Sequence, residues 1–212
     1  FMALMSLLGF LGIWEYFRMA REGGVPSQPK WGLIISAFYL GVLAWLLGSR
    51  GHAALDLMHA VDAALITLTV LLGFVWQLRC PVDGHKTFTE VAVTTLGFVY
   101  VVVMFSFVSR LLFLPQLDES VPGAWLIIWL VLVTKFTDMG AYVTGSFIGK
   151  HKMIPHISPG KTWEGLLGAF IGAVGAGMLM KWGAGAQMAF VSWSSALVLC
   201  VLIAIVCVAG DL

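Results

Sequence analysis

Seven apolar stretches, separated by short polar or Gly/Pro-rich turns, dominate the sequence. Each is close to, or above, the roughly 20 residues that a helix needs to cross a bilayer. Backbone in lipid must satisfy its own hydrogen bonds, so helices are the economical structure for such stretches. We therefore predict an all-α fold, a polytopic transmembrane helical bundle of about seven spans. The expected spans are residues 1–17, 31–48, 60–78, 90–114, 123–148, 165–181 and 190–209.

The composition excludes two classes of protein. Hydrophobic residues make up 60% of the chain and charged residues 11%, with a mean hydropathy of +0.96. A soluble domain carries about 25% charged residues, so this chain is not an ordinary soluble domain. The net charge of +1 argues against a nucleic-acid partner. The three cysteines (Cys80, Cys200, Cys207) form no CxxC pair and predict neither a zinc site nor a disulfide framework.

Basic residues gather in the loops that follow odd-numbered spans. These are Arg18, Arg21, Lys30, Arg79, Lys86, Lys150, Lys152 and Lys161. The other loops and their borders hold Arg50, Arg110 and Lys181. The positive-inside rule places the richer loops in the cytoplasm. With seven spans, Asp211 emerges on the same side as the 150–164 loop, so the two polar clusters are expected to meet.

The fifth predicted span contains two charged residues, Lys135 and Asp138. A charge at membrane depth costs about 2.5–3.5 kcal/mol, so it normally faces a bundle interior or a wet cavity. The two residues are three apart on a helix, near enough to form a purely structural pair. In the alternative interpretation Asp138 lines a site, because Tyr142, Gly145 and Gly149 follow it at helical spacing and form a polar, small-residue face.

A compact polar segment, residues 158–165, separates the fifth and sixth predicted spans. Ser158 followed by Pro159 predicts a helix N-cap and a first-turn proline. Lys161 then falls in the first helical turn, where the helix dipole disfavours a cation unless an anion also binds there. Glu164 could orient Lys161 or bind a metal. The alternative is a surface ion pair that contributes little.

The sequence of this segment disfavours two other types of site. Gly160-Lys161-Thr162 is not a P-loop, because that motif requires a glycine five positions before Gly160, where Pro155 stands. A zinc site at His151 and His156 is disfavoured, because no acidic residue lies near them in the loop sequence. We expect these histidines to add positive charge at an anionic membrane surface.

Glycines recur every three or four residues in the sixth predicted span, at Gly165, Gly168, Gly172 and Gly175. Small residues at this spacing let helices approach closely. The packing could lie within the bundle or between subunits. Both arrangements stay open, the second giving a homo-oligomer through the Gly-rich helix 165–177.

Three short motifs resemble the phosphatidate cytidylyltransferases, the CDP-diacylglycerol synthases. They are Thr-Asp-Met-Gly-Ala-Tyr at 137–142, Gly-Lys-His-Lys at 149–152 and Ser-Pro-Gly-Lys-Thr-Trp-Glu-Gly at 158–165. The resemblance is close from about Val133 to Gly168. It implies a multi-pass enzyme of the bacterial inner membrane, with a cytoplasmic active site that joins CTP to phosphatidate. Its partners would be CTP, phosphatidate and membrane lipid, its products CDP-diacylglycerol and pyrophosphate, and its cofactor Mg²⁺ or a similar divalent cation.

The resemblance also assigns roles to individual residues. Those implied in catalysis are Asp138, Lys161, Glu164 and Asp211. Those implied in substrate binding are Lys150, Lys152, Ser158, Lys161 and Thr162. Gly210-Asp211 matches a Gly-Asp of the family that supplies a metal-binding aspartate, so Asp211 is the expected metal ligand. The family's C-terminal signature would begin beyond Leu212. We therefore expect residues 1–212 to form a single transmembrane cytidylyltransferase domain, as a fragment that lacks this signature.

Two competing functions remain at this point. One is a related CTP-dependent membrane enzyme that acts on another lipid acceptor. The other is a small-molecule transporter, in which Asp138 and Lys135 would bind substrate or coupling ions. A transporter is expected to show two similar halves with paired interruptions, and the sequence shows no such repeat.

Overall fold

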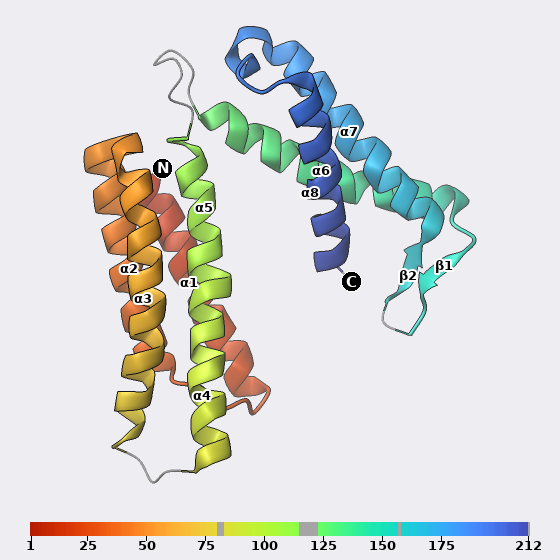
Figure 1. Cartoon of the computed structure of the whole chain (residues 1–212). Helices are drawn as coiled ribbons and strands as arrows, with labels where there is room; N and C mark the ends of the chain where they lie inside the picture. The colour runs from red at the N-terminus through yellow and green to blue at the C-terminus, as the bar shows by residue number, and fades with distance from the viewer. Residues whose placement is uncertain (80–82, 115–122, 157, 212) are drawn as a thin grey trace. The chain divides into compact units, whose positions relative to one another are not determined.

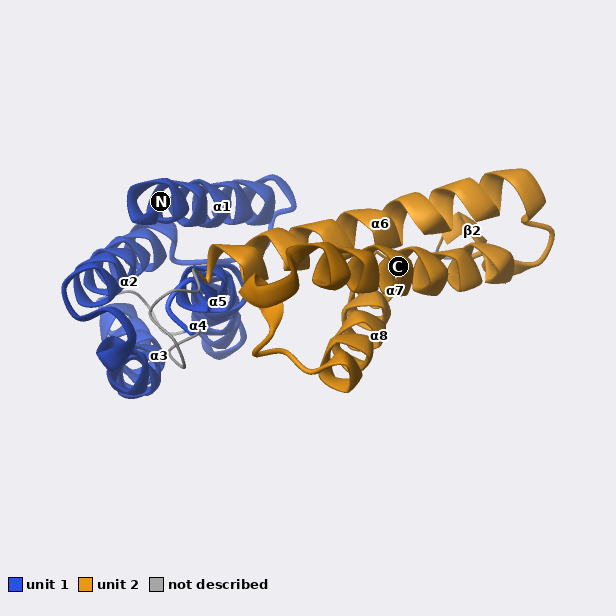
Figure 2. Ribbon diagram, turned by 90° about the horizontal axis from the view of Figure 1, so that it is seen from above, with its two compact units in different colours: residues 1–116 blue, residues 117–212 orange. Residues whose placement is uncertain are grey.

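The computed structural model describes residues 1–79, 83–114, 123–156 and 158–211. The described chain is mainly helical, as Figure 1 shows, and the predicted all-α bundle is confirmed. Two compact units are distinguished, residues 1–116 and 117–212 (Figure 2), and each is described by itself. The expectation of a single domain over 1–212 stays a prediction. Cys80 lies outside the described residues.

The first unit is a bundle of four helical rods. Its helices are α1 (Met2–Glu22), α2 (Pro29–Arg50), α3 (Ala54–Gln77), α4 (Gly84–Gly97) and α5 (Met104–Leu111). A short 3₁₀ turn, Gly51–Ala53, joins α2 to α3. A wide π-helical turn, Phe98–Val103, joins α4 to α5, so that the two form one continuous rod.

The second unit consists of three long helices and a β-hairpin. Its elements are α6 (Ala124–Ile148), β1 (Lys152–Ile154), β2 (Ser158–Thr162), α7 (Trp163–Ala184), a 3₁₀ turn (Gly185–Met188) and α8 (Trp193–Gly210). The hairpin connects α6 to α7, and α7 packs against both α6 and α8.

Five helical segments within the described ranges are long and apolar enough to cross a membrane. They are Pro29–Gln77, Gly84–Leu111, Ala124–Ile148, Trp163–Met188 and Trp193–Gly210. The predicted count was about seven. The first segment contains both α2 and α3, which the prediction counted separately. Helix α1 is not among the five, and its last two turns carry Glu15, Arg18, Arg21 and Glu22. These segments make the chain a multi-pass membrane protein.

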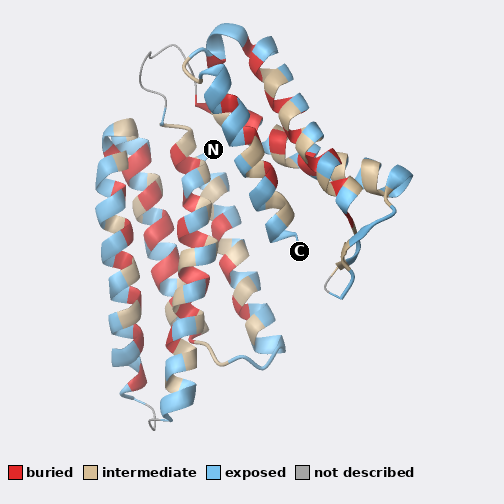
Figure 3. Cartoon of the chain, turned by 45° about the vertical axis from the view of Figure 1, so that its right-hand side comes forward, coloured by how far each residue is buried: buried red, intermediate tan, exposed pale blue. Residues whose placement is uncertain are grey.

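Exposed and buried residues alternate along the helices, as the colours of Figure 3 show. Many of the exposed residues have large apolar side chains. On α2, for example, Ile34, Phe38 and Trp45 are exposed, whereas Tyr39 and Leu43 are buried. Lipid tails are as apolar as leucine, so a helix in a membrane can expose apolar side chains to them. Small and polar residues then gather between the helices. The exposure pattern therefore agrees with a membrane environment.

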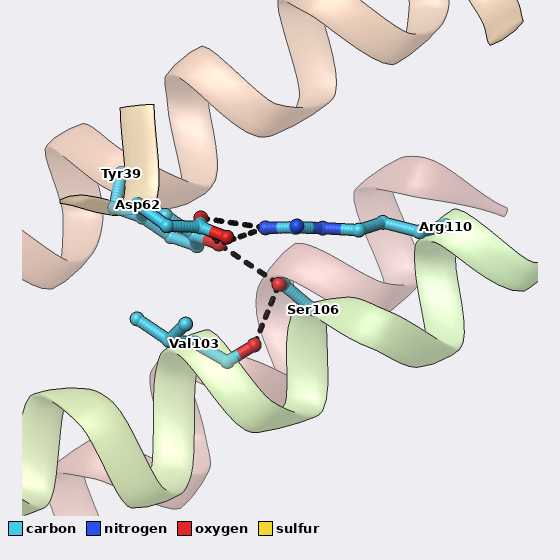
Figure 4. Close-up of polar contacts among 5 residues, drawn as sticks. All are labelled: Tyr39, Asp62, Val103, Ser106 and Arg110. Atoms are coloured by element: carbon cyan, nitrogen blue, oxygen red, sulfur yellow. Dashed lines mark hydrogen bonds and ion pairs between the residues drawn. The ribbon is translucent and has the colours of Figure 1, made fainter. Parts of the chain in front are cut away.

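A buried ion pair ties three helices of the first unit together (Figure 4). Nη2 of Arg110 lies 2.6 Å from Oδ1 of Asp62 and donates to the Tyr39 hydroxyl at 2.7 Å. The Tyr39 hydroxyl in turn lies 2.8 Å from Oδ1 of Asp62 and 2.8 Å from Oγ of Ser106. Arg110 is 5% exposed and Asp62 is 9% exposed. Because water does not solvate these two charges, the attraction between them offsets the cost of burying each one.

The glycines of α7 bring its backbone against that of α6. A Cβ on Gly168 would lie 1.9 Å from Oγ1 of Thr144 and 2.4 Å from the Gly140 carbonyl oxygen. A Cβ on Gly172 would lie 2.2 Å from the Phe136 carbonyl oxygen. The small-residue face therefore packs within the unit. Oligomerisation through this helix stays a prediction, and Gly175, whose Cβ would meet nothing within 4 Å, does not take part in the α6 contact.

We expect Gly168→Ala to destabilise the protein and Gly175→Ala to leave it unchanged or slightly more stable. The first change forces two helix backbones apart, at a cost of about 1–3 kcal/mol for overpacking. The second adds a methyl group in open space and favours the helix. Thermal unfolding of both variants in the same detergent measures the difference. Equal melting temperatures would contradict the close α6–α7 packing.

Candidate active site

The polar segment between α6 and α7 forms a hairpin, which differs from the prediction. β1 and β2 pair antiparallel, with Lys152 opposite Thr162 and Ile154 opposite Ser158. Ser158 and Pro159 therefore lie in a strand and do not cap a helix. The N-cap of α7 is Thr162, whose Oγ1 accepts a hydrogen bond from the backbone N–H of Gly165 at 3.1 Å. Strand pairing satisfies backbone groups of the 158–162 segment that a helix start would have left free.

Lys161 lies in β2, before the helix begins, rather than in the first helical turn. Its Nζ is 3.0 Å from Oδ2 of Asp211 and donates to the Val208 carbonyl at 3.5 Å. The hairpin and the C-terminal end of α8 are therefore joined by an ion pair. The expected meeting of the two polar clusters is confirmed.

A cavity of about 230 Å³ lies beside this ion pair. α6 contributes Asp138 and Tyr142 to its wall, β2 contributes Lys161 and Thr162, and Asp211, the residue after α8, also lines it. The sequence did not single out three other lining residues, Met153, Cys207 and Val208. Cys207 lies one helical turn before Asp211. Helical spacing from Asp211 could therefore have predicted that Cys207 lies on the same face.

Glu164 lies in the first turn of α7 and fastens the start of the hairpin. Its Oε1 is 2.6 Å from Nδ1 of His151, and its Oε2 accepts from the backbone N–H groups of Lys150 and His151 at 3.2 and 3.3 Å. Its carboxylate forms no contact with Lys161 among the described residues. His151 thus has an acidic partner in space, although none lies near it in the loop sequence.

The remaining predicted residues divide into those at the cavity and those away from it. Asp138 and Thr162 line the cavity, and Thr162 is buried. Lys150, just before the hairpin, and Lys152, in β1, are exposed, and Ser158 is half-buried in β2 outside the cavity. Asp138 forms no ion pair with Lys135 within the described ranges. The structural pairing of these two residues is therefore not seen.

The carboxylates at this cavity match the ligands that a magnesium ion prefers. Asp138 and Asp211 line the same cavity. In the described part of the chain, no group of three or more His, Cys, Asp or Glu side chains could hold a metal. Mg²⁺ is commonly bound through one or two carboxylates, with waters and substrate phosphates as its other ligands. Two carboxylates at one cavity fit that pattern.

The chain thus combines helices long and apolar enough to cross a membrane with a cavity beside the Lys161–Asp211 ion pair. The model of the cytidylyltransferase family matches residues 1–212, and the chain belongs to this family. The family assignment sets the transporter interpretation aside.

Relatives from several bacteria are named phosphatidate cytidylyltransferase. The one from Staphylococcus saprophyticus is 32% identical over 212 residues, covering 97% of this chain and 69% of the relative. That from Haemophilus influenzae is 27% identical and covers 82% and 61%, and that from Bacillus subtilis is 28% identical and covers 81% and 58%. The chain thus spans about three fifths of the length of the last two relatives.

Proposed function

We propose that the protein transfers the cytidylyl group of CTP to phosphatidate, forming CDP-diacylglycerol and pyrophosphate. A phosphate oxygen of phosphatidate forms a bond to the α-phosphorus of CTP, and the bond from that phosphorus to pyrophosphate breaks. The observation that carries the proposal is the cavity at which Lys161, Asp138 and Asp211 lie together. The names of the relatives support the choice of substrates.

Charge neutralisation is the main task in this reaction, because two anionic groups must approach each other. We propose that Lys161 exchanges its partner Asp211 for a substrate phosphate, which Nζ can reach from the wall of the cavity. Lys150, just before the hairpin, and Lys152, in β1, are exposed and would attract the anionic substrates. Glu164 and Ser158 would act through the hairpin, by holding Lys161 and Thr162 in place.

We further propose that Asp211 and Asp138 hold a divalent cation, Mg²⁺ or a similar ion. Such an ion, when bound, neutralises phosphate charge. The two carboxylates would come from the end of α8 and from α6, on different sides of one cavity. In this arrangement Asp138 has a role in the site, which gives a reason for an acidic residue within a membrane-spanning helix.

We propose that the site faces the cytoplasm, which the distribution of Lys and Arg supports. A single cysteine introduced at Lys86, in the first turn of α4, is then expected to resist an impermeant thiol reagent added to intact cells. A single cysteine at Ser49, at the end of α2, is expected to react. Both are introduced into a protein without its native cysteines. Equal reactivity of the two positions would contradict this orientation.

Membranes that contain the complete protein test the reaction. With labelled CTP we expect lipid product when phosphatidate is added, and loss of that product when divalent ions are chelated. The control acceptors are other phospholipids at the same concentration. Product from one of those acceptors, but not from phosphatidate, would identify a related enzyme with a different lipid acceptor.

A further inference from the structure

Thr162 lies at the junction of the hairpin and α7. It is the last residue of β2 and the N-cap of α7, into which β2 runs directly (Figure 1). Its side chain is buried, and it stands opposite Lys152 in the hairpin. A side chain that caps a helix is held by the backbone of that helix. The direction of the Thr162 side chain is therefore fixed relative to α7.

Three glycines at the facing ends of α6 and α7 surround the Thr162 hydroxyl, and we call them the glycine notch. A Cβ on Gly145 would lie 3.3 Å from Oγ1 of Thr162, one on Gly149 2.7 Å, and one on Gly165 3.1 Å. A Cβ on Gly149 would also lie 2.9 Å from Cγ2 of Thr162. The side chain of Thr162 thus occupies space that a larger residue at Gly149 would take, so the notch seats it against α6 as well as α7.

Lys161 precedes Thr162 in the same strand, and successive side chains of a strand point to opposite faces. Thr162 points to the glycine notch. Lys161 points to the end of α8, where its Nζ lies 3.0 Å from Oδ2 of Asp211 and 3.5 Å from the Val208 carbonyl oxygen. A rotation of β2 about its axis would therefore move both side chains together. What holds Thr162 in the notch also holds the Lys161 ammonium at the cavity.

The ion pair at the cavity does not by itself hold Lys161 in place. The side chain of Lys161 is 21% exposed and that of Asp211 is 77% exposed. An ion pair so open to water contributes little, because solvent screens it. The contacts of Thr162 are buried instead, and they lie one residue away from Lys161.

We propose that Thr162 is a positioning residue for Lys161 and acts without contacting the substrate itself. The inference rests on the proposed cytidylyl transfer, and it changes the role of Thr162, which the family resemblance placed among the substrate-binding residues. Seated in the glycine notch, Thr162 sets the direction of β2. It thereby sets the place at which the Lys161 ammonium meets a substrate phosphate.

A double-mutant cycle of Thr162 and Lys161 in the complete protein tests this role. It compares kcat/KM for CTP with phosphatidate, in membranes with matched amounts of folded protein. Thr162→Val keeps the shape of the side chain and removes the capping oxygen. It should lower kcat/KM about tenfold or more, since a misplacement of about 1 Å can cost about 100-fold. In the Lys161→Ala protein the same change should cost less than about twofold, because no ammonium remains to be placed.

Two further variants control this cycle. Thr162→Ser keeps the capping oxygen and should keep most of the activity. Thr67→Val makes the same change as Thr162→Val on an exposed threonine of α3, whose Oγ1 donates to the Ala63 carbonyl of its own helix. It should keep full activity.

Gly149→Ala tests the notch from a residue outside the cavity lining. The new Cβ presses on Thr162, so it should also lower kcat/KM about tenfold or more through misplacement, and less than about twofold in the Lys161→Ala protein. Gly175→Ala, whose Cβ meets nothing within 4 Å, is its control. If Thr162→Val does not fold, Gly149→Ala takes its place in the cycle.

The outcomes separate this inference from the proposed function. An equal fall in both backgrounds would mean that Thr162 contacts the substrate or only supports the fold, and would overturn the inference. Full activity of Thr162→Val would overturn it as well. Failure of the unaltered protein to form CDP-diacylglycerol would overturn the proposed function, and the inference with it.

Discussion

Asp211→Asn is expected to lower the turnover of CTP with phosphatidate by about 100-fold or more. The substitution removes a carboxylate that we propose as a ligand of the divalent ion, and such an ion contributes several kcal/mol to charge stabilisation. Excess Mg²⁺ should restore little, because the amide carries no charge. Initial rates in membranes with matched amounts of the complete protein measure the effect. Asp56→Asn, an exposed carboxylate of α3 in the first unit, is the control and should keep full activity.

Substitutions of Lys161 and of Asp138 separate the roles of the other charges at the cavity. Lys161→Ala should weaken substrate use by about 1.5–3 kcal/mol, the range for a hydrogen bond to a charged group. Lys161→Arg should rescue it only in part, because a planar fork replaces a compact charge. Asp138→Asn should lose activity while the protein stays folded. Recovery of that activity by Lys135→Met in the same chain would mean that Asp138 only neutralises Lys135.

Arg110→Met is expected to destabilise the protein by about 3–5 kcal/mol, because it leaves the Asp62 carboxylate buried without its partner. The double variant with Asp62→Leu should recover most of the loss, since it removes both charges. Arg50→Met, an exposed change at the end of α2, is the control. Thermal unfolding in one detergent compares the four proteins. An Arg110→Met protein that unfolds together with the control would show that the pair in Figure 4 does not hold the bundle.

The apolar stretches were sufficient to predict the long helices. The length and hydropathy of a segment alone indicate whether it can cross a membrane as a helix. The sequence also predicted that the polar clusters of Lys161 and Asp211 lie on the same side of the membrane, since two predicted spans, an even number, separate them in the chain. The structure places the two side chains 3.0 Å apart. The shared side needed only the order of the spans, whereas the contact itself depends on how the hairpin and the end of α8 are packed.

Features that depend on pairing between distant residues could not be predicted in the same way. Ser158-Pro159 has the local pattern of a helix start, yet the 158–162 segment pairs with β1 and forms a strand. The glycine spacing of α7 indicated close packing but not the partner, which is α6. Asp62 and Arg110 lie in separate predicted spans, and their opposite charges within apolar stretches were the one signal that could have linked them.

Transfer of the α-phosphate of CTP to lipid is the measurement that tests the central claim most directly. The complete protein is given phosphatidate with CTP labelled at either the α- or the γ-phosphate, in parallel with Asp211→Asn. We expect α-label in CDP-diacylglycerol, γ-label only in pyrophosphate, and neither product from the variant. Label from the γ-phosphate in the lipid, or α-label incorporated equally by the variant, would contradict cytidylyl transfer at this cavity.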